Sequence, residues 1–237
     1  MSTTGLPWLA ACAALAALWV LAASWNRERG SGATALRGVL GGLAALVTAW
    51  GAYALVHAVG VDLRWDWLSG ASWPALGAAA GIGLIEEGAK LTGIALAVSP
   101  ARRGNRRSNV LRTAAAAAAV FAVAEAALVL RGASWPMALG RAALGPVAHA
   151  LLAAPFAVAL AEASGVSRRR LALRVGGTLL LAAALHGLGD WSIARPGWGQ
   201  VGFAAVLLAP ALWLFAHARA VERVPIRWAD GFAARSR

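Results

Sequence analysis

Apolar runs long enough to cross a lipid bilayer recur along this chain, and they constrain its fold more than any other feature of the sequence. Hydrophobic residues make up 60% of the 237 residues and charged residues only 14%. A soluble domain carries about a quarter charged residues, and a disordered segment is poor in apolar residues and rich in charge. The composition therefore excludes both classes and predicts an integral membrane protein.

The apolar runs predict seven membrane-spanning helices joined by short hydrophilic segments. We expect these helices at residues 6–24, 38–60, 74–98, 113–130, 138–162, 175–191 and 200–217. A cleaved signal peptide is an alternative for the first, but that segment lacks a basic start and its apolar stretch is long, so we interpret it as an anchor. The expected fold class is all-α, a polytopic membrane helix bundle that forms a single integral membrane domain over residues 1–237.

Arginine is distributed unevenly between the two sides of this predicted bundle. Seventeen arginines lie in the segments 25–37, 99–112 and 163–174 and in the C-terminal tail, against three in the alternate loops. Positive charge holds a loop on the cytoplasmic side, which predicts an N-terminus outside and a cytoplasmic C-terminus. The net charge of +12 is then a topology signal and not a sign of nucleic-acid binding. The expected surroundings are a lipid bilayer, specifically a bacterial plasma membrane.

Several ionisable residues lie inside the predicted spans, where each charge costs on the order of 3 kcal/mol and marks function unless pairing explains it. Their spacings place them on one face of each helix, at similar depths along helices that rise about 1.5 Å per residue. We therefore expect these acids and imidazoles to meet inside the bundle, at a depth between the middle of the membrane and its outer leaflet. They lie on the third to sixth spans: Glu86, Glu87 and Lys90, then Glu125, then Arg141 and His149, then His186 and Asp190.

Two kinds of chemistry stay open for such a cluster. Glutamates and histidines in a dry cavity can activate a water molecule and stabilise a developing oxyanion. The same side chains can bind zinc or another divalent ion. A purely structural role is also conceivable, because Glu86 and Lys90 have the spacing of a helical ion pair, although that pair leaves Glu87 unexplained. A serine nucleophile is excluded because no serine lies mid-span, and no His-Glu-x-x-His motif occurs.

The order and spacing of these residues also resemble a known family. Four motifs carry the resemblance: Glu86-Glu87-x-x-Lys90, Phe121-x-x-x-Glu125, Arg141 eight residues before His149, and His186-x-x-x-Asp190. They are similar to those of the PrsW family of intramembrane metalloproteases, which is related to the type II CAAX prenyl proteases and the bacteriocin-processing enzymes. The resemblance covers residues 74–191 and implies a peptidase that hydrolyses a peptide bond of a membrane protein with a glutamate-activated water, assisted by a divalent metal such as zinc.

The resemblance implies catalytic roles for the three ionisable residues of the first motif. Glu86 and Glu87 would supply the general base and position the water, without the sequence showing which of them is the base. Lys90 would balance the charge of the carboxylates.

The resemblance also implies which residues hold the metal or the oxyanion. These would be Glu125, His149 and His186, and Asp190 would orient His186. The substrate would be a membrane protein, whose identity the sequence does not reveal, and the oligomeric state stays undetermined.

Two other functions are alternatives to a peptidase. A non-catalytic scaffold subunit would use the polar cluster as a packing network. A proton or ion carrier would use it as a relay, although carriers often have broken helices or paired repeats, for which Pro155 is the one candidate interruption here.

Overall fold

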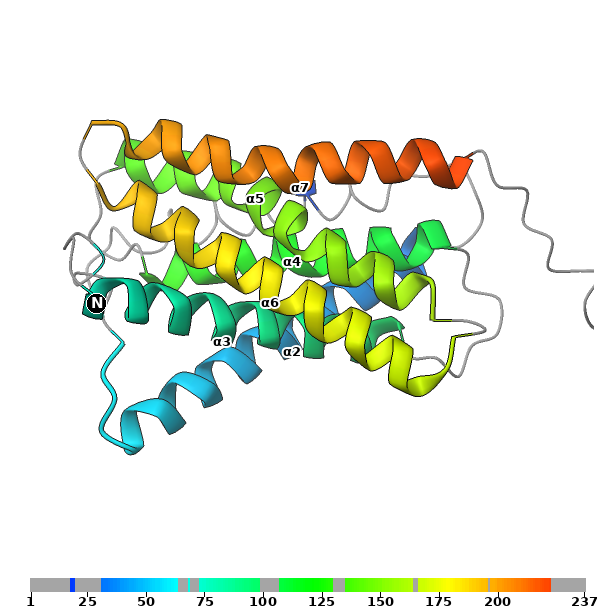
Figure 1. Ribbon diagram of the computed structural model, residues 1–237, viewed down its shortest axis with the longest axis horizontal. Helices are drawn as coiled ribbons and strands as arrows, with labels where there is room; N and C mark the ends of the chain where they lie inside the picture. Colours follow the sequence, from blue (N-terminus) through cyan, green and yellow to red (C-terminus); the bar gives the residue numbers. More distant parts are fainter. Residues whose placement is uncertain are drawn as a thin grey trace, which may run out of the picture.

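The computed structural model describes residues 18–19, 31–63, 68, 73–98, 107–129, 135–163, 166–195 and 197–222, and this part of the chain contains no strand. Its six helices run back and forth along the long axis of one bundle (Figure 1), which confirms the all-helical prediction. The first predicted helix, at residues 6–24, lies outside the described residues except for Leu18 and Trp19. The helices are α2 (Ser31–Ala58), α3 (Trp73–Val98), α4 (Arg107–Val129), α5 (Trp135–Ala161), α6 (Arg168–Ile193) and α7 (Gly199–Glu222).

Five of the six helices are long and apolar enough to cross a membrane. The candidate spans lie in α2, α4, α5, α6 and α7. The remaining helix, α3, is 26 residues long, but Glu86, Glu87 and Lys90 at its middle give it more charge than an ordinary span carries. Its charged residues are therefore the feature of the fold that needs a functional or structural explanation.

Three helices begin well before the apolar runs that predicted them. The predictions placed these starts at residues 38, 113 and 175, whereas α2, α4 and α6 begin at Ser31, Arg107 and Arg168. Hydropathy marks where a helix enters lipid and not where its hydrogen bonding begins, so the polar first turns were missed. At α6 the extra turns have their own start signal, because the Ser167 hydroxyl caps the N-terminus of the helix by accepting from the Arg170 N–H at 3.5 Å.

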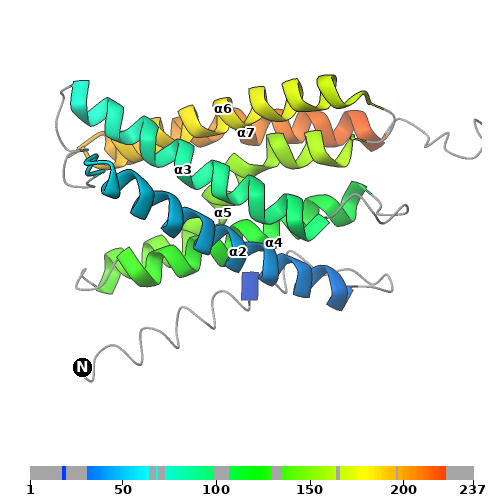
Figure 2. The ribbon, with the colours of Figure 1, turned by 90° about the horizontal axis from the view of Figure 1, so that it is seen from below.

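Glycine allows α2 to pass very close to its neighbours. A Cβ on Gly93 of α3 would lie 2.9 Å from the Ala45 Cβ of α2, and one on Gly42 of α2 would lie 2.7 Å from the carbonyl oxygen of Ala117 in α4. Figure 2 shows α2 crossing obliquely beside both helices. Small residues let membrane helices approach closely where the hydrophobic effect no longer drives association.

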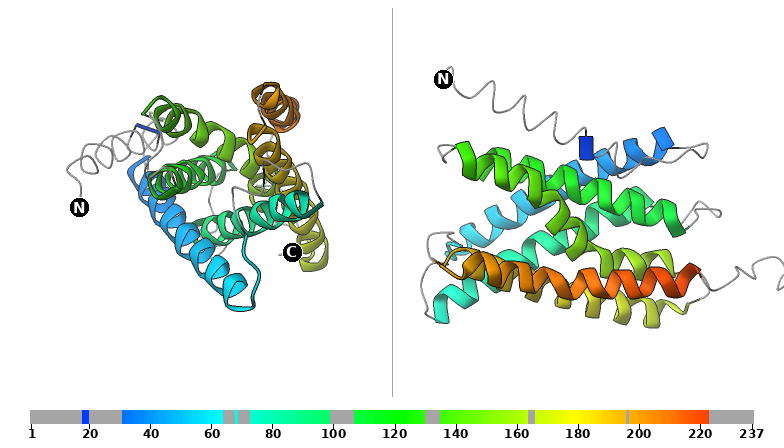
Figure 3. Two further views of the ribbon diagram at one scale, coloured as in Figure 1. Left: turned by 90° about the vertical axis from the view of Figure 1, so that its left-hand side faces the viewer. Right: turned by 90° about the horizontal axis from the view of Figure 1, so that it is seen from above.

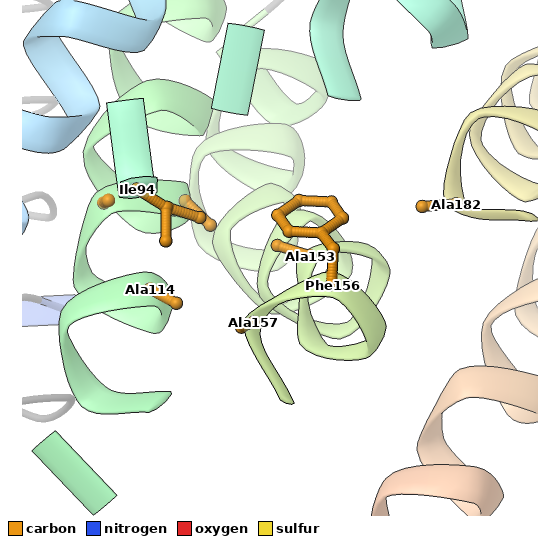
Figure 4. Close-up of a cluster of buried hydrophobic side chains, with 8 residues drawn as sticks. Ile94, Ala114, Ala153, Phe156, Ala157 and Ala182 are labelled. Carbon is orange, nitrogen blue, oxygen red and sulfur yellow. The ribbon is translucent and has the colours of Figure 1, made fainter. Parts of the chain in front are cut away.

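The interior at one end of the helices α3 to α6 is packed by alanines around one aromatic ring. Phe156 of α5 is fully buried and belongs to one apolar cluster with Ile94 of α3, Ala114 of α4 and Ala182 of α6 (Figure 4). The end-on view shows that α7 lies outside this core, against α5 and α6 (Figure 3). The core therefore ties together the four helices α3 to α6 that carry the ionisable residues.

The course of α5 changes direction near its middle (Figure 3). Two prolines, Pro146 and Pro155, lie inside this helix, and proline removes a backbone donor and bends a helix. His149 lies between them, so the bent part of α5 is the part that presents an imidazole to α3.

Candidate active site

The middle of α3 carries three buried ionisable side chains that face the interior of the bundle. Glu86, Glu87 and Lys90 are almost completely removed from solvent, and Glu87 is 0% exposed. The neighbouring helix α6 comes unusually close at this level, because a Cβ on its Gly187 would lie 2.6 Å from the carbonyl oxygen of Ala79 in α3. This close crossing brings the histidine next to Gly187 into contact with the glutamates.

Glu87 is the centre of the resulting network. Its Oε1 atom lies 2.5 Å from the Lys90 Nζ atom and 2.6 Å from the His186 Nδ1 atom. A carboxylate has only acceptors, so both nitrogens donate to it. These two charge-assisted hydrogen bonds fix the position of Glu87 and the ring orientation of His186.

The opposite nitrogen of His186 faces two more carboxylates. His186 Nε2 lies 3.4 Å from Glu86 Oε2 and 3.3 Å from Asp190 Oδ2. Asp190 follows His186 by one turn on α6, so the same helix face that carries the imidazole also carries its second acidic neighbour. His186 therefore connects both α3 glutamates to Asp190.

The network continues from Lys90 to the helices α5 and α4. Lys90 Nζ lies 3.0 Å from His149 Nδ1, and an ammonium group can only donate, so this nitrogen accepts and the imidazole hydrogen is on Nε2. That Nε2 atom lies 3.3 Å from Glu125 Oε2. Glu125 Oε1 in turn accepts from Arg141 Nη2 at 3.2 Å.

Aromatic rings enclose the middle of this network. The His149 and His186 rings meet edge to face with centroids 5.3 Å apart, and the Phe121 ring lies 5.7 Å from that of His149. Lys90 Nζ also lies 5.5 Å above the Phe121 ring. Phe121, which belongs to the motif Phe121-x-x-x-Glu125, thus covers the cation and limits access of lipid and water to it.

All seven residues predicted from the sequence lie in one connected network. They come from four helices, α3, α4, α5 and α6, and every one is buried: Glu86, Glu87, Lys90, Glu125, His149, His186 and Asp190. The expectation that acids and imidazoles of neighbouring spans meet at one place therefore agrees with the geometry.

Two further residues contact the network, and neither received a role from the sequence. Tyr53 of α2 donates its hydroxyl hydrogen to Glu86 Oε1 at 3.0 Å. Nothing in the sequence identified it, because a tyrosine in an apolar span is not conspicuous in the way a charge is. Arg141 was noted as a charge inside a predicted span and as part of a motif, eight residues before His149, but neither signal gave it a role.

Three buried carboxylate oxygens have no hydrogen-bond partner in the part of the chain that the structure describes. They are Glu86 Oε2, Glu87 Oε2 and Asp190 Oδ2. An unpartnered buried charge is expensive. The described network also contains four carboxylates, Glu86, Glu87, Glu125 and Asp190, but only two permanently cationic side chains, Lys90 and Arg141. Both observations fit a site that receives a positively charged group.

The donor set fits a divalent metal ion. Glu86, His149 and His186 each offer a ligand atom, and these atoms lie within 4.8 Å of one another. The set predicted from the sequence had Glu125 in the place of Glu86, and Glu125 stays a prediction as a ligand. To bind an ion, His149 would have to give up one of its present partners, Lys90 or Glu125.

Comparison with known proteins gives one result that covers most of the chain. The model of the family described as PrsW family intramembrane metalloprotease matches residues 40–215. No curated protein matches the chain, and no solved structure does. The matched range includes the whole buried network.

Proposed function

The chain belongs to the PrsW family of intramembrane metalloproteases. We propose that the buried network is its active site, with Glu86 as the general base. The observation that carries the proposal is the position of Glu86 Oε2, which has no hydrogen-bond partner within the described residues and lies 3.4 Å from His186 Nε2. A protease of this class hydrolyses a peptide bond of a protein substrate with water. Glu86 Oε2 is free to accept a proton from that water.

The remaining carboxylates position the groups around Glu86. Glu87 holds His186 through Nδ1 and holds Lys90 through Nζ. Asp190 lies beside His186 Nε2. The imidazole is therefore set in one orientation before substrate arrives, which lowers the cost of reorganisation during the reaction.

A hydrogen-bond donor for the developing oxyanion comes from α5. With Nδ1 of His149 accepting from Lys90, its Nε2–H group is a donor that can turn from Glu125 to the substrate carbonyl oxygen as negative charge grows there. Arg141 and Lys90 add positive charge at the two ends of this arrangement.

The family implies a metal, and the residues that would hold it are Glu86, His149 and His186. As ligands, Glu86 and His149 would use the atoms that otherwise act as base and oxyanion donor, and Glu87, whose Oε2 has no hydrogen-bond partner within the described residues, would then be the carboxylate that accepts the proton. When bound, a divalent ion such as zinc would polarise the substrate carbonyl and make the attacking water more acidic. The three unpartnered carboxylate oxygens around this set support this assignment.

We further propose the membrane arrangement that the arginine distribution predicts. Seven helices would cross a bacterial plasma membrane, with the N-terminus outside and the C-terminus in the cytoplasm, as a single domain over residues 1–237 whose motifs lie at 74–191. The five apolar helices and the lipid-exposed leucines and tryptophans around the buried network support this arrangement.

Glu86→Gln tests the proposed base. The substrate can be sought by comparing membrane-protein cleavage products in bacteria that express either the wild type or this variant, and turnover is then measured on that substrate in nanodiscs. Loss of a general base lowers turnover by about 10²–10⁴-fold. The matched control is Glu162→Gln, because Glu162 contacts Arg174 and His217 away from the network.

The thermal unfolding midpoint separates catalysis from packing. We expect Glu86→Gln to unfold near the wild-type temperature while losing turnover. A variant that unfolds much earlier but cleaves at the wild-type rate while folded would show that the network serves packing and would contradict the proposal.

A further inference from the structure

Tyr53 reaches the network from a helix that carries none of the ionisable site residues. Its hydroxyl donates to Glu86 Oε1 at 3.0 Å. We propose that Tyr53 is a positioning residue for the reaction, which holds one oxygen of Glu86 so that the other faces His186 and the position of the water or ion. The inference rests on the proposed role of Glu86.

The two oxygens of Glu86 have different surroundings, and this difference is what Tyr53 creates. Oε1 accepts from Tyr53, whereas Oε2 has no hydrogen-bond partner within the described residues and lies 3.4 Å from His186 Nε2. The terminal torsion of a glutamate is broad and roughly two-fold. Without a donor on Oε1 the carboxylate can therefore rotate, and Oε2 loses its fixed direction.

Packing holds the Tyr53 ring in place independently of its hydroxyl. The ring contacts two apolar clusters, one that contains Ala45, Ala49 and Phe121 and one that contains Leu68 and Ile82. A ring fixed on both sides delivers its hydroxyl to one position. Replacing Tyr53 by phenylalanine should therefore keep the ring packing and remove only the hydrogen bond.

The position of α2 is also determined by packing against α3. Gly41 and Gly93 meet where these two helices cross, and a Cβ on Gly41 would lie 3.0 Å from the Gly93 carbonyl oxygen. Side chains of a helix lean toward its N-terminus, so Tyr53 leans back toward the level of this crossing and of Glu86. Tyr53 is also the single tyrosine of the chain, so no other phenolic hydroxyl can take its place.

The test compares Tyr53→Phe, Glu86→Gln and the double variant in nanodiscs. The readouts are the affinity for Zn²⁺ alone, kcat and KM on the cleaved membrane protein, and the unfolding midpoint. Removal of a group that orients a ligand typically lowers metal affinity or activity 10–100-fold. We expect Tyr53→Phe to lose about that much in Zn²⁺ affinity and in kcat, with KM nearly unchanged and an unfolding midpoint within a few degrees of wild type.

The double variant tests whether Tyr53 acts through Glu86. If it does, adding Tyr53→Phe to Glu86→Gln costs nothing further, because coupled residues are not additive. Fully additive losses would overturn the inference. The control is Thr48→Val, five residues earlier on α2. The Thr48 hydroxyl donates to the Ala44 carbonyl of its own helix at 2.8 Å, and we expect this variant to match the wild type in every readout.

The outcomes for the inference and for the proposed function are distinguishable. If Glu86→Gln is inactive while Tyr53→Phe binds Zn²⁺ and turns over like the wild type, the positioning role is wrong and the base stands. If Glu86→Gln itself keeps full turnover, the proposed function fails and the positioning role fails with it.

Discussion

At the scale of single residues, the buried pair Lys90 and Glu87 decides whether the network can exist. Their side chains are 1% and 0% exposed, and each ion is removed from water at a cost of several kcal/mol that only a close partner offsets. Lys90 also donates to His149. The Lys90 ammonium group thus fixes Glu87 of α3 and His149 of α5 relative to each other.

Replacing this lysine should destabilise the folded protein strongly. Lys90→Met leaves Glu87 buried with less positive charge beside it, and breaking a buried pair in this way costs about 3–5 kcal/mol. The measurement is the free energy of unfolding in detergent micelles, from denaturant titration.

An exposed ion pair on the same protein is the control for Lys90→Met. Arg174 is 57% exposed and lies 3.8 Å from Glu162, and such pairs contribute about 0–1 kcal/mol. Arg174→Met should therefore change stability little. Equal losses in the two variants would show that the Lys90 contacts are no more important than a surface pair.

At the scale of helices, the crossing of α3 and α6 brings two of the proposed catalytic groups, Glu87 and His186, into contact. Gly187 of α6 lies against the Ala79 backbone, and Gly83 of α3 lies against that of Ala183. These contacts leave no room for side chains between the two helices. The 2.6 Å contact between His186 and Glu87 depends on this approach, because the histidine adjoins one of the two glycines.

Gly187→Ala should separate the helices and impair the site. The new Cβ would lie 2.6 Å from the Ala79 carbonyl oxygen, and overpacking of this kind costs about 1–3 kcal/mol. We expect lower stability together with at least a tenfold loss of turnover, since a displacement of about 1 Å can cost 10²-fold in rate.

Gly177→Ala on the same helix is the matched control for the crossing. A Cβ there meets no atom of the described chain within 4 Å, and alanine favours a helix over glycine by about 0.5–1 kcal/mol. The control should be as stable as the wild type or more so, with unchanged turnover. A loss in the control equal to that of Gly187→Ala would contradict the importance of the crossing.

At the scale of the whole molecule, the sides of the bundle are largely apolar, whereas a cluster of acidic and basic side chains is buried in its interior. Large apolar side chains are exposed all around the bundle, among them Trp50 at 75% and Leu180 at 63%, as expected of a surface covered by lipid. Trp73 and Trp198 are exposed at the starts of α3 and α7, on the side predicted to be outside. Indoles prefer the headgroup layer, so these two residues indicate the level of one interface.

Cysteine labelling tests the proposed orientation. In a Cys12→Ala background, Asp62→Cys lies in a loop predicted to be outside and Arg169→Cys in one predicted to be cytoplasmic. A maleimide that cannot cross the membrane should label position 62 on intact cells and position 169 only after lysis. Labelling of position 169 on intact cells would show that the arginine distribution was misread.

The sequence by itself determined the membrane class, the helical fold and the seven candidate site residues of the network. The first two follow from the long apolar runs, because a bilayer requires helices whose backbone groups are bonded internally. The third follows from the cost of a charge inside such a run, which makes it conspicuous. The early starts of α2, α4 and α6 were not predicted, because hydropathy detects the apolar part of a helix and does not detect polar helical turns that precede it.

Only the tertiary structure decided which of these residues touch. It grouped Glu86, in place of Glu125, with the two histidines, added Tyr53 from α2, and linked Lys90 to His149 across two helices. Each of these contacts depends on the rotation and depth of one helix against another. Small residues at the helix crossings set this rotation and depth, among them Gly41, Gly83, Gly93 and Gly187. Their effect depends on which backbone packs against them, so it cannot be predicted from one helix alone.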